Sequence, residues 1–132
     1  MIDMSTSRSV DGNIRALRGA TSVVGNDADA IVAATAELLT ELLDRNGARG
    51  EDLVSIVFTS TPDLTAAFPA VAARSLGIND VPLLCASEIA VDGALPRCVR
   101  VLMHLYTDRD PDRLVHVYLG EARRLRADPA PT

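Results

Sequence analysis

The chain lacks lysine and tryptophan, and it has only two phenylalanines, two tyrosines, two cysteines and two histidines among its 132 residues. So few aromatic rings leave little that could stack on nucleobases. The net charge of −5 provides no basic surface to release counterions from a phosphate backbone, so we expect no nucleic-acid partner. No segment approaches the roughly 20 apolar residues of a membrane span, and residues 1–13 lack the apolar stretch of a signal peptide. We therefore expect a cytosolic protein with no membrane contact.

The few cysteines and histidines argue against a disulfide and against a metal centre. Cys85 and Cys98 lie in apolar surroundings without C-x-x-C spacing, which favours reduced thiols. Only His104 and His116 could join them as ligands. We therefore expect neither a metal nor another cofactor.

Aliphatic side chains are abundant, because 48% of the residues are hydrophobic although aromatics are scarce. A chain of this length buries most of an apolar core without metals or cross-links, and this composition is typical of α/β or α+β proteins. We expect a single domain over residues 14–127. The polar residues 1–13 are predicted to form a disordered leader, and residues 128–132 a flexible tail.

The apolar spacing predicts two helices and five strands. Residues 29–46 carry leucines at helical spacing, with acidic residues at the start and Gly47 just past the end. A shorter helix is expected at 68–76, and strands are expected at 14–23, 53–59, 81–89, 98–107 and 114–119. For 98–107 the periodicity also permits a buried helix. The order of these elements predicts an α+β fold, a mixed β-sheet with helices packed on one face. Self-association is the economical way to cover the other face.

Arginines within apolar segments are the most informative feature of the chain. Arg100 lies in the run Cys98 to Tyr106, and Arg18 lies in Ile14 to Thr21. A guanidinium cannot lose its proton and is almost never buried alone, so each needs a nearby anion. All 13 basic residues are arginines, which codon usage in a GC-rich genome also explains, so their positions are more informative than their number. Both positions indicate a small anionic ligand.

Three further residues have structural as well as functional interpretations. Glu88 follows apolar sequence and could be an ordinary solvated strand end. Tyr118 could be a core tyrosine whose hydroxyl reaches a backbone group, and Phe68 could simply fill the core.

Taken together, seven short motifs resemble the monofunctional, trimeric bacterial chorismate mutases in order and spacing, from about Ile14 to Arg126. They are Arg18-Gly19-Ala20-Thr21, Thr61-Pro62-Asp63-Leu64, Phe68-Pro69-Ala70, Cys85-x-x-Glu88, Cys98-Val99-Arg100-Val101, His116-Val117-Tyr118-Leu119 and Leu125-Arg126. The resemblance implies a homotrimer with a pseudo-α/β-barrel core and an active site at each subunit interface. It also implies the substrate chorismate, which rearranges to prephenate in aromatic amino acid biosynthesis without proton transfer or a covalent enzyme intermediate.

The resemblance also implies roles for individual residues. Arg100 matches the arginine that faces the breaking ether oxygen, and Glu88 the carboxylate that accepts a hydrogen bond from the ring hydroxyl. Arg18 and Tyr118 match donors to a substrate carboxylate, and Arg126 matches a residue that closes over the ligand. Other expected substrate contacts are Leu125 as the apolar cover, Cys85 beside the ring, the adjoining Leu83 and Leu84, and Phe68, Ala70 and Arg74 as the wall from the adjacent subunit.

Two positions depart from the family pattern. Val71 stands where the family often has a lysine at the mouth of the site, and Leu84 stands where it often has threonine. Loss of the rim cation should weaken substrate capture more than the chemical step, because it is remote from the bond that breaks.

Two alternative functions remain, a trimeric imine deaminase and a non-catalytic anion-binding module.

Overall fold

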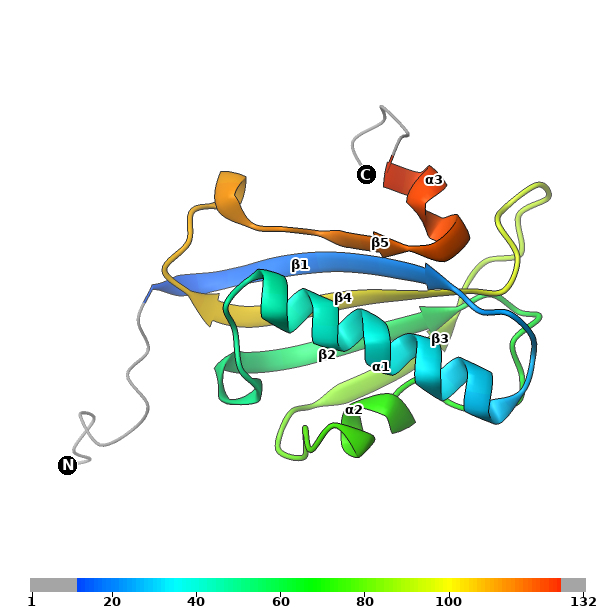
Figure 1. Cartoon of the computed structure of the whole chain (residues 1–132), viewed down its shortest axis with the longest axis horizontal. Coiled ribbons are helices and arrows are strands. Elements are labelled where there is room, and N and C mark those ends of the chain that lie inside the picture. The colour runs from blue at the N-terminus through cyan, green and yellow to red at the C-terminus, as the bar shows by residue number, and fades with distance from the viewer. Residues whose placement is uncertain (1–11, 127–132) are drawn as a thin grey trace.

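The computed structural model describes residues 12–126, which form one five-stranded mixed sheet with two helices packed on one face (Figure 1). In chain order the elements are β1 (Asn13–Ser22), α1 (Ala28–Arg45), β2 (Leu53–Ser60), α2 (Val71–Ser75), β3 (Leu83–Ser87), β4 (Cys98–Thr107), β5 (Val117–Leu119) and α3 (Arg123–Arg126). Single 3-10 turns lie at Gly50–Asp52, Pro111–Arg113 and Gly120–Ala122. The predicted α+β class with one helical layer is confirmed.

The strand order is β3-β2-β4-β1-β5, so β4 is the central strand. It runs antiparallel to both β1 and β2, whereas the outer pairs β2–β3 and β1–β5 are parallel. Residues 98–107 are therefore a strand, and the alternative of a buried helix is excluded. In this register Arg100 lies opposite Ala20 of β1 and Thr59 of β2.

Helix α1 matches its sequence signals. The Asp27 side chain accepts a hydrogen bond from the Ala30 amide at 2.9 Å and caps the first turn. Leu38, Leu39 and Leu42 are fully buried against the sheet. At Gly19 of β1, an added Cβ would lie only 2.9 Å from a Leu42 methyl carbon, so the glycine lets α1 pack closely on the sheet. The predicted helix over 29–46 is confirmed with a shift of one residue at each end.

The shorter elements differ more from their predicted bounds. Helix α2 covers only Val71–Ser75 of the predicted 68–76, because Phe68 and Pro69 form a turn whose carbonyls accept from Val71 and Ala72. Strand β3 is Leu83–Ser87, shorter than 81–89. Strand β5 starts only at Val117, because both backbone polar groups of Val115 bind the Asn46 side chain, at 2.8 Å each. These are side-chain interactions that sequence periodicity does not reveal.

Alternate residues of each strand face opposite sides of the sheet. In β4, Val99, Val101 and Met103 are buried beneath the helical layer, whereas Arg100 and Leu102 are exposed on the opposite side. We call these sides the covered face and the open face. The core therefore lies between the sheet and α1 and α2.

The C-terminal part of the chain returns to this sheet. Helix α3, which the sequence did not predict, follows β5 at the end of the sheet (Figure 1). Residues 1–11 and 127–132, which include most of the predicted leader and the whole predicted tail, lie outside the described residues. Within 12–126, no helix is both long and apolar enough to cross a membrane.

Candidate active site

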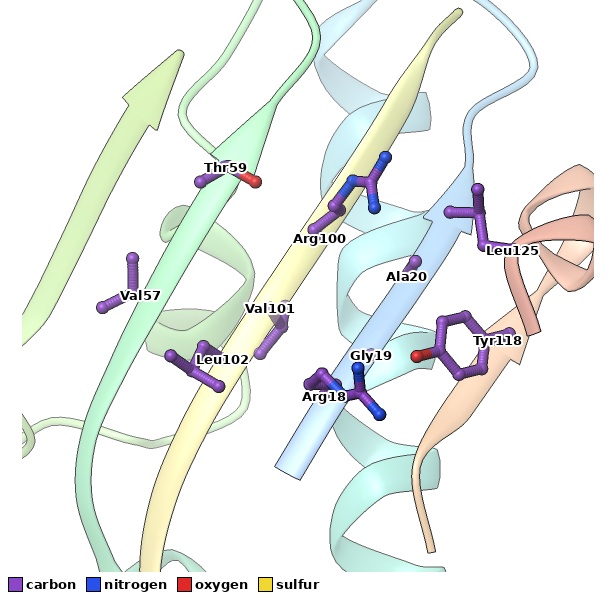
Figure 2. Close-up of a pocket in the computed structure, with 10 residues that line it drawn as sticks. All are labelled: Arg18, Gly19, Ala20, Val57, Thr59, Arg100, Val101, Leu102, Tyr118 and Leu125. Carbon is purple, nitrogen blue, oxygen red and sulfur yellow. The ribbon is translucent and has the colours of Figure 1, made fainter. Parts of the chain in front are cut away.

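A hollow of about 530 Å³ lies on the open face, over the central strands (Figure 2). Its walls come from β1, β2, β4, β5 and α3, and they are apolar except for a few polar side chains. The lining residues are Arg18, Gly19, Ala20, Val57, Thr59, Arg100, Val101, Leu102, Tyr118 and Leu125. Four of the predicted site residues, Arg18, Arg100, Tyr118 and Leu125, are thus brought together. An apolar hollow with convergent polar groups is the usual form of a small-molecule site.

Arg100 lines this hollow and forms an ion pair with Glu88, which borders another hollow of about 240 Å³. Its Nε lies 3.0 Å from Glu88 Oε2, and the same oxygen accepts a hydrogen bond of 2.6 Å from the Thr59 hydroxyl. The Arg100 side chain is 44% exposed and that of Glu88 only 18%. The sequence predicts an anion close to Arg100, and in the structure the Glu88 carboxylate is that anion.

Backbone contacts position Glu88 just beyond the end of β3. Its amide donates to the Ser60 carbonyl at 2.9 Å, which continues the parallel pairing of β2 and β3 by one residue. The carboxylate then turns back towards Thr59 and Arg100. Glu88 is thus not an ordinary solvated strand end.

Arg18 and Tyr118 lie together at another part of the hollow. Figure 2 shows the Tyr118 hydroxyl directed towards the Arg18 side chain. The backbone amide of Arg18 donates to Nδ1 of His116 at 3.0 Å, which joins β1 to the residue preceding β5. Burial, with a smaller contribution from the Arg18 charge, lowers the pKa of His116 below its usual 6.5. The ring is therefore held neutral, with Nδ1 as the acceptor.

A hydrogen-bonded turn fixes the start of β4, close to Arg100. The buried Thr61 hydroxyl accepts from the Cys98 amide at 3.0 Å and donates to Asp63, which also accepts from the Arg97 amide at 3.0 Å. The bond from Thr61, reinforced by the Arg97 amide and charge, holds the pKa of Asp63 below its usual 3.8. Burial raises the pKa of the Cys98 thiol to about 11, so this sulfur remains a thiol at neutral pH.

The other predicted site residues lie elsewhere in the chain. Phe68, which is 71% exposed, and Cys85 border a second hollow of about 490 Å³ beside β3. Ala70 and Leu83 pack into the core, and Cys85 also contacts it. Leu84 lies on the open face and is 62% exposed. Arg74 is exposed on α2, and Arg126 is exposed at the end of α3. The predicted residues of one chain therefore do not all adjoin one hollow.

Sequence reasoning missed Thr59 and the apolar wall residues Val57 and Leu102. Val57 and Thr59 alternate with the buried Phe58, which is a detectable signal for a shared face. Their proximity to Arg100 depends on the pairing register of β2 with β4, which no local pattern gives.

Comparisons with known proteins identify the family of this chain. A family model described as chorismate mutase type I matches residues 14–129. The chain belongs to that family. It is similar to the chorismate mutase AroH of Thermus thermophilus, with 51% identity over 87% of this chain and 95% of the relative. The chorismate mutase AroH of Bacillus subtilis is 41% identical over 87% of this chain and 91% of its own length.

Structural comparison gives the same family. A chorismate mutase from Clostridium thermocellum superposes with a TM-score of 0.82 at 50% identity, covering 83% of this chain and 98% of the other. The resemblance drawn from the sequence motifs is therefore confirmed. These findings do not favour the imine deaminase or the anion-binding module.

Proposed function

We propose that this protein converts chorismate to prephenate by an intramolecular Claisen rearrangement. The observation that carries the proposal is the Arg100–Glu88 ion pair at the rim of an apolar hollow that also holds Arg18 and Tyr118. These residues lie in a chain of the chorismate mutase type I family. They provide fixed charges of both signs for a dianionic substrate.

The rearrangement needs electrostatic stabilisation rather than a nucleophile or a general base. As the ether bond breaks, negative charge develops on its oxygen, and a donor that is already oriented stabilises that charge. The Arg100 Nε is engaged by Glu88, so we assign contact with the ether oxygen to the terminal guanidinium nitrogens. A rigid planar fork can serve the oxygen and a neighbouring carboxylate at once, which a lysine would do less well.

The remaining groups select and hold the reactive conformer. In this proposal Arg18 and Tyr118 bind a substrate carboxylate, and Glu88 accepts a hydrogen bond from the ring hydroxyl. Val57, Leu102 and Leu125 form apolar walls that exclude water and strengthen these interactions. Arg126 extends beyond Leu125 and closes over the ligand.

We further propose a homotrimer in which each site is shared between two copies. Two features support it: the open face exposes Leu84 and Leu102, and Phe68 and Cys85 border a hollow separate from the one that Arg100 lines. A cyclic interface joins two different surfaces, so Phe68 and Arg74 of one copy can complete the hollow of the next. Leu83, Leu84, Cys85 and Ala70 then adjoin the shared site.

The decisive experiment is a steady-state assay of the purified protein with chorismate in the presence of a metal chelator. We expect loss of chorismate and formation of an equal amount of prephenate. A short 2-imino acid serves as the comparison substrate, and its turnover without chorismate turnover would establish a deaminase instead. Sedimentation equilibrium should give three times the 14.0 kDa chain mass.

Ligand binding separates catalysis from simple anion binding. An enzyme binds the transition state more tightly than the substrate, whereas a binding module need not. We expect a bicyclic ether dicarboxylate that mimics the transition state to bind at least about a hundredfold more tightly than chorismate. Equal affinities in calorimetry would support the anion-binding module.

A further inference from the structure

Thr59 connects the two groups on which the proposed chemistry depends. It lies opposite Arg100 in the β2–β4 ladder, and its hydroxyl donates to Glu88 Oε2 at 2.6 Å. Arg100 Nε reaches the same oxygen at 3.0 Å. A hydroxyl donor from one strand and a guanidinium nitrogen from the neighbouring strand therefore meet on one carboxylate oxygen.

This arrangement restricts the side chain of Glu88, which lies at the start of an irregular segment. Glu88 follows the last residue of β3, and the residues from Ile89 to Arg97 form turns and loop rather than strand. Its backbone is held through the Ser60 carbonyl, and the Thr59 hydrogen bond and the Arg100 ion pair on Oε2 then fix the carboxylate. Because Arg100 binds through Nε, the orientation of the carboxylate also orients the rest of the guanidinium.

We propose that Thr59 is a positioning residue for the rearrangement. It does not act on the substrate; its hydroxyl holds Glu88, and through Glu88 it directs the terminal nitrogens of Arg100 into the hollow. This inference rests on the proposed function. A carboxylate accepts hydrogen bonds only, so the position requires a donor, and serine can replace threonine where valine cannot.

The same pair of strands offers a matched control. Ser55 lies on the same face of β2, four residues before Thr59, and its hydroxyl lies 3.2 Å from Nδ1 of His104. Ser55 is absent from the lining of the hollow. Ser55→Ala therefore removes a cross-strand hydroxyl contact without touching Glu88. It measures how much activity is lost when such a contact is removed for structural reasons alone.

The test compares Thr59→Val, Thr59→Ser and Ser55→Ala. Loss of a hydrogen bond to a charged group predicts a fall in kcat of about tenfold to a hundredfold for Thr59→Val, with a smaller change in KM. We expect Thr59→Ser to recover most of this loss, and Ser55→Ala to match the wild-type protein. If Thr59→Ser is as impaired as Thr59→Val, or if only KM changes, the positioning role is wrong.

A double-mutant cycle tests whether Thr59 acts through Glu88. In a Glu88→Ala background no carboxylate remains for Thr59 to hold, so Thr59→Val should lower kcat by less than about threefold further. Independent, multiplicative effects of the two substitutions would overturn the proposal.

A spectroscopic measurement keeps this inference separate from the proposed function. In ¹⁵N-labelled protein, the Nε–H signal of Arg100 should shift or broaden in Thr59→Val and stay in place in Ser55→Ala. A wild-type protein that leaves chorismate unchanged would refute the function while this signal still reports the geometry. An Arg100 signal that is identical in the wild type and in Thr59→Val would refute the positioning role alone.

Discussion

The two faces of the sheet are built from the same strands but have different roles. Phe58 and Val99 lie on the covered face and are fully buried. Their neighbours Thr59 and Arg100 point the other way, where the hollow lies (Figure 2). A shift of one residue thus separates a side chain that stabilises the fold from one that we assign to binding or chemistry.

This separation means that stability and activity should respond to different substitutions. The covered face is closely packed, so its side chains cannot be shortened without leaving a cavity. The open face holds partly exposed side chains. Their removal should lower the free energy of unfolding of a single chain only slightly. Substitutions on either side of each strand can test whether the division holds, starting with the largest expected effect.

Arg100→Ala should produce the largest change, and it should be confined to activity. Loss of a donor to the transition state costs roughly 3 kcal/mol or more per contact, so we expect kcat/KM to fall by several orders of magnitude, about a thousandfold or more. Arg100→Lys keeps the charge but loses the planar fork, and it should recover only part of the rate. Kinetics and thermal unfolding of the same preparations provide the measurement. Turnover that survives in Arg100→Ala would remove this residue from the mechanism.

Phe58→Ala should show the opposite behaviour. Phe58 is fully buried on the covered face, so truncation is expected to lower the free energy of unfolding by about 3–5 kcal/mol. Val57→Ala, one residue earlier and on the open face, should cost about 1 kcal/mol or less because the side chain is only partly buried. Urea unfolding at one fixed protein concentration compares the two. Equal losses would mean that both faces contribute alike to the stability of the chain.

Much of the fold could be predicted from the sequence because its main signals are local. Helical leucine spacing predicted α1 to within one residue at each end, and the strand expected at 98–107 matches β4. The ends of α2 and β5 could not be predicted in the same way. They depend on Pro69 and on hydrogen bonds between Asn46 and Val115, which lies 69 residues away.

The candidate site was predictable only in part, for a related reason. An arginine within an apolar run indicated an anion, and the structure supplies Glu88. Thr59 carries no such signal, because a threonine in a strand is ordinary and its partner is 29 residues distant. The positions of Phe68 and Cys85 at a second hollow reflect strand order, which periodicity alone does not specify.

Leu84→Asp tests whether other copies cover the open face. Leu84 is 62% exposed beside Val57, and burial of an unpaired carboxylate between copies would cost a few kcal/mol at each interface. We expect sedimentation to show a shift from the trimer towards single chains, with loss of activity. Thr40→Asp adds the same charge to the exposed side of α1 and should leave the sedimentation mass of the trimer unchanged. If Leu84→Asp also retains the wild-type mass, Leu84 does not lie in an interface.

The smallest expected effect concerns His116, which joins strands rather than belonging to either face. Its pKa is lowered in the folded protein, so the unfolded chain binds more protons near pH 6.5 and below. The stability that neutral His116 contributes is therefore complete above pH 6.5 and is lost as the pH falls through the lowered folded-state pKa. Protonation of Nδ1 also removes the acceptor for the Arg18 amide, beside the group that we assign to substrate binding.

His116→Asn isolates this contribution. Asparagine can place an acceptor oxygen close to the position that Nδ1 of His116 occupies, but its side chain does not titrate. We expect the wild-type free energy of unfolding to fall more steeply between pH 7 and 5 than that of the variant. Asp63 is common to both proteins, and its own loss, at lower pH, cancels in the difference. Parallel curves from urea unfolding over this range would show that the His116 bond contributes nothing that depends on pH. If the wild-type curve is steeper, as expected, the chemistry at Arg100 should still be unaffected at every pH at which the protein remains folded.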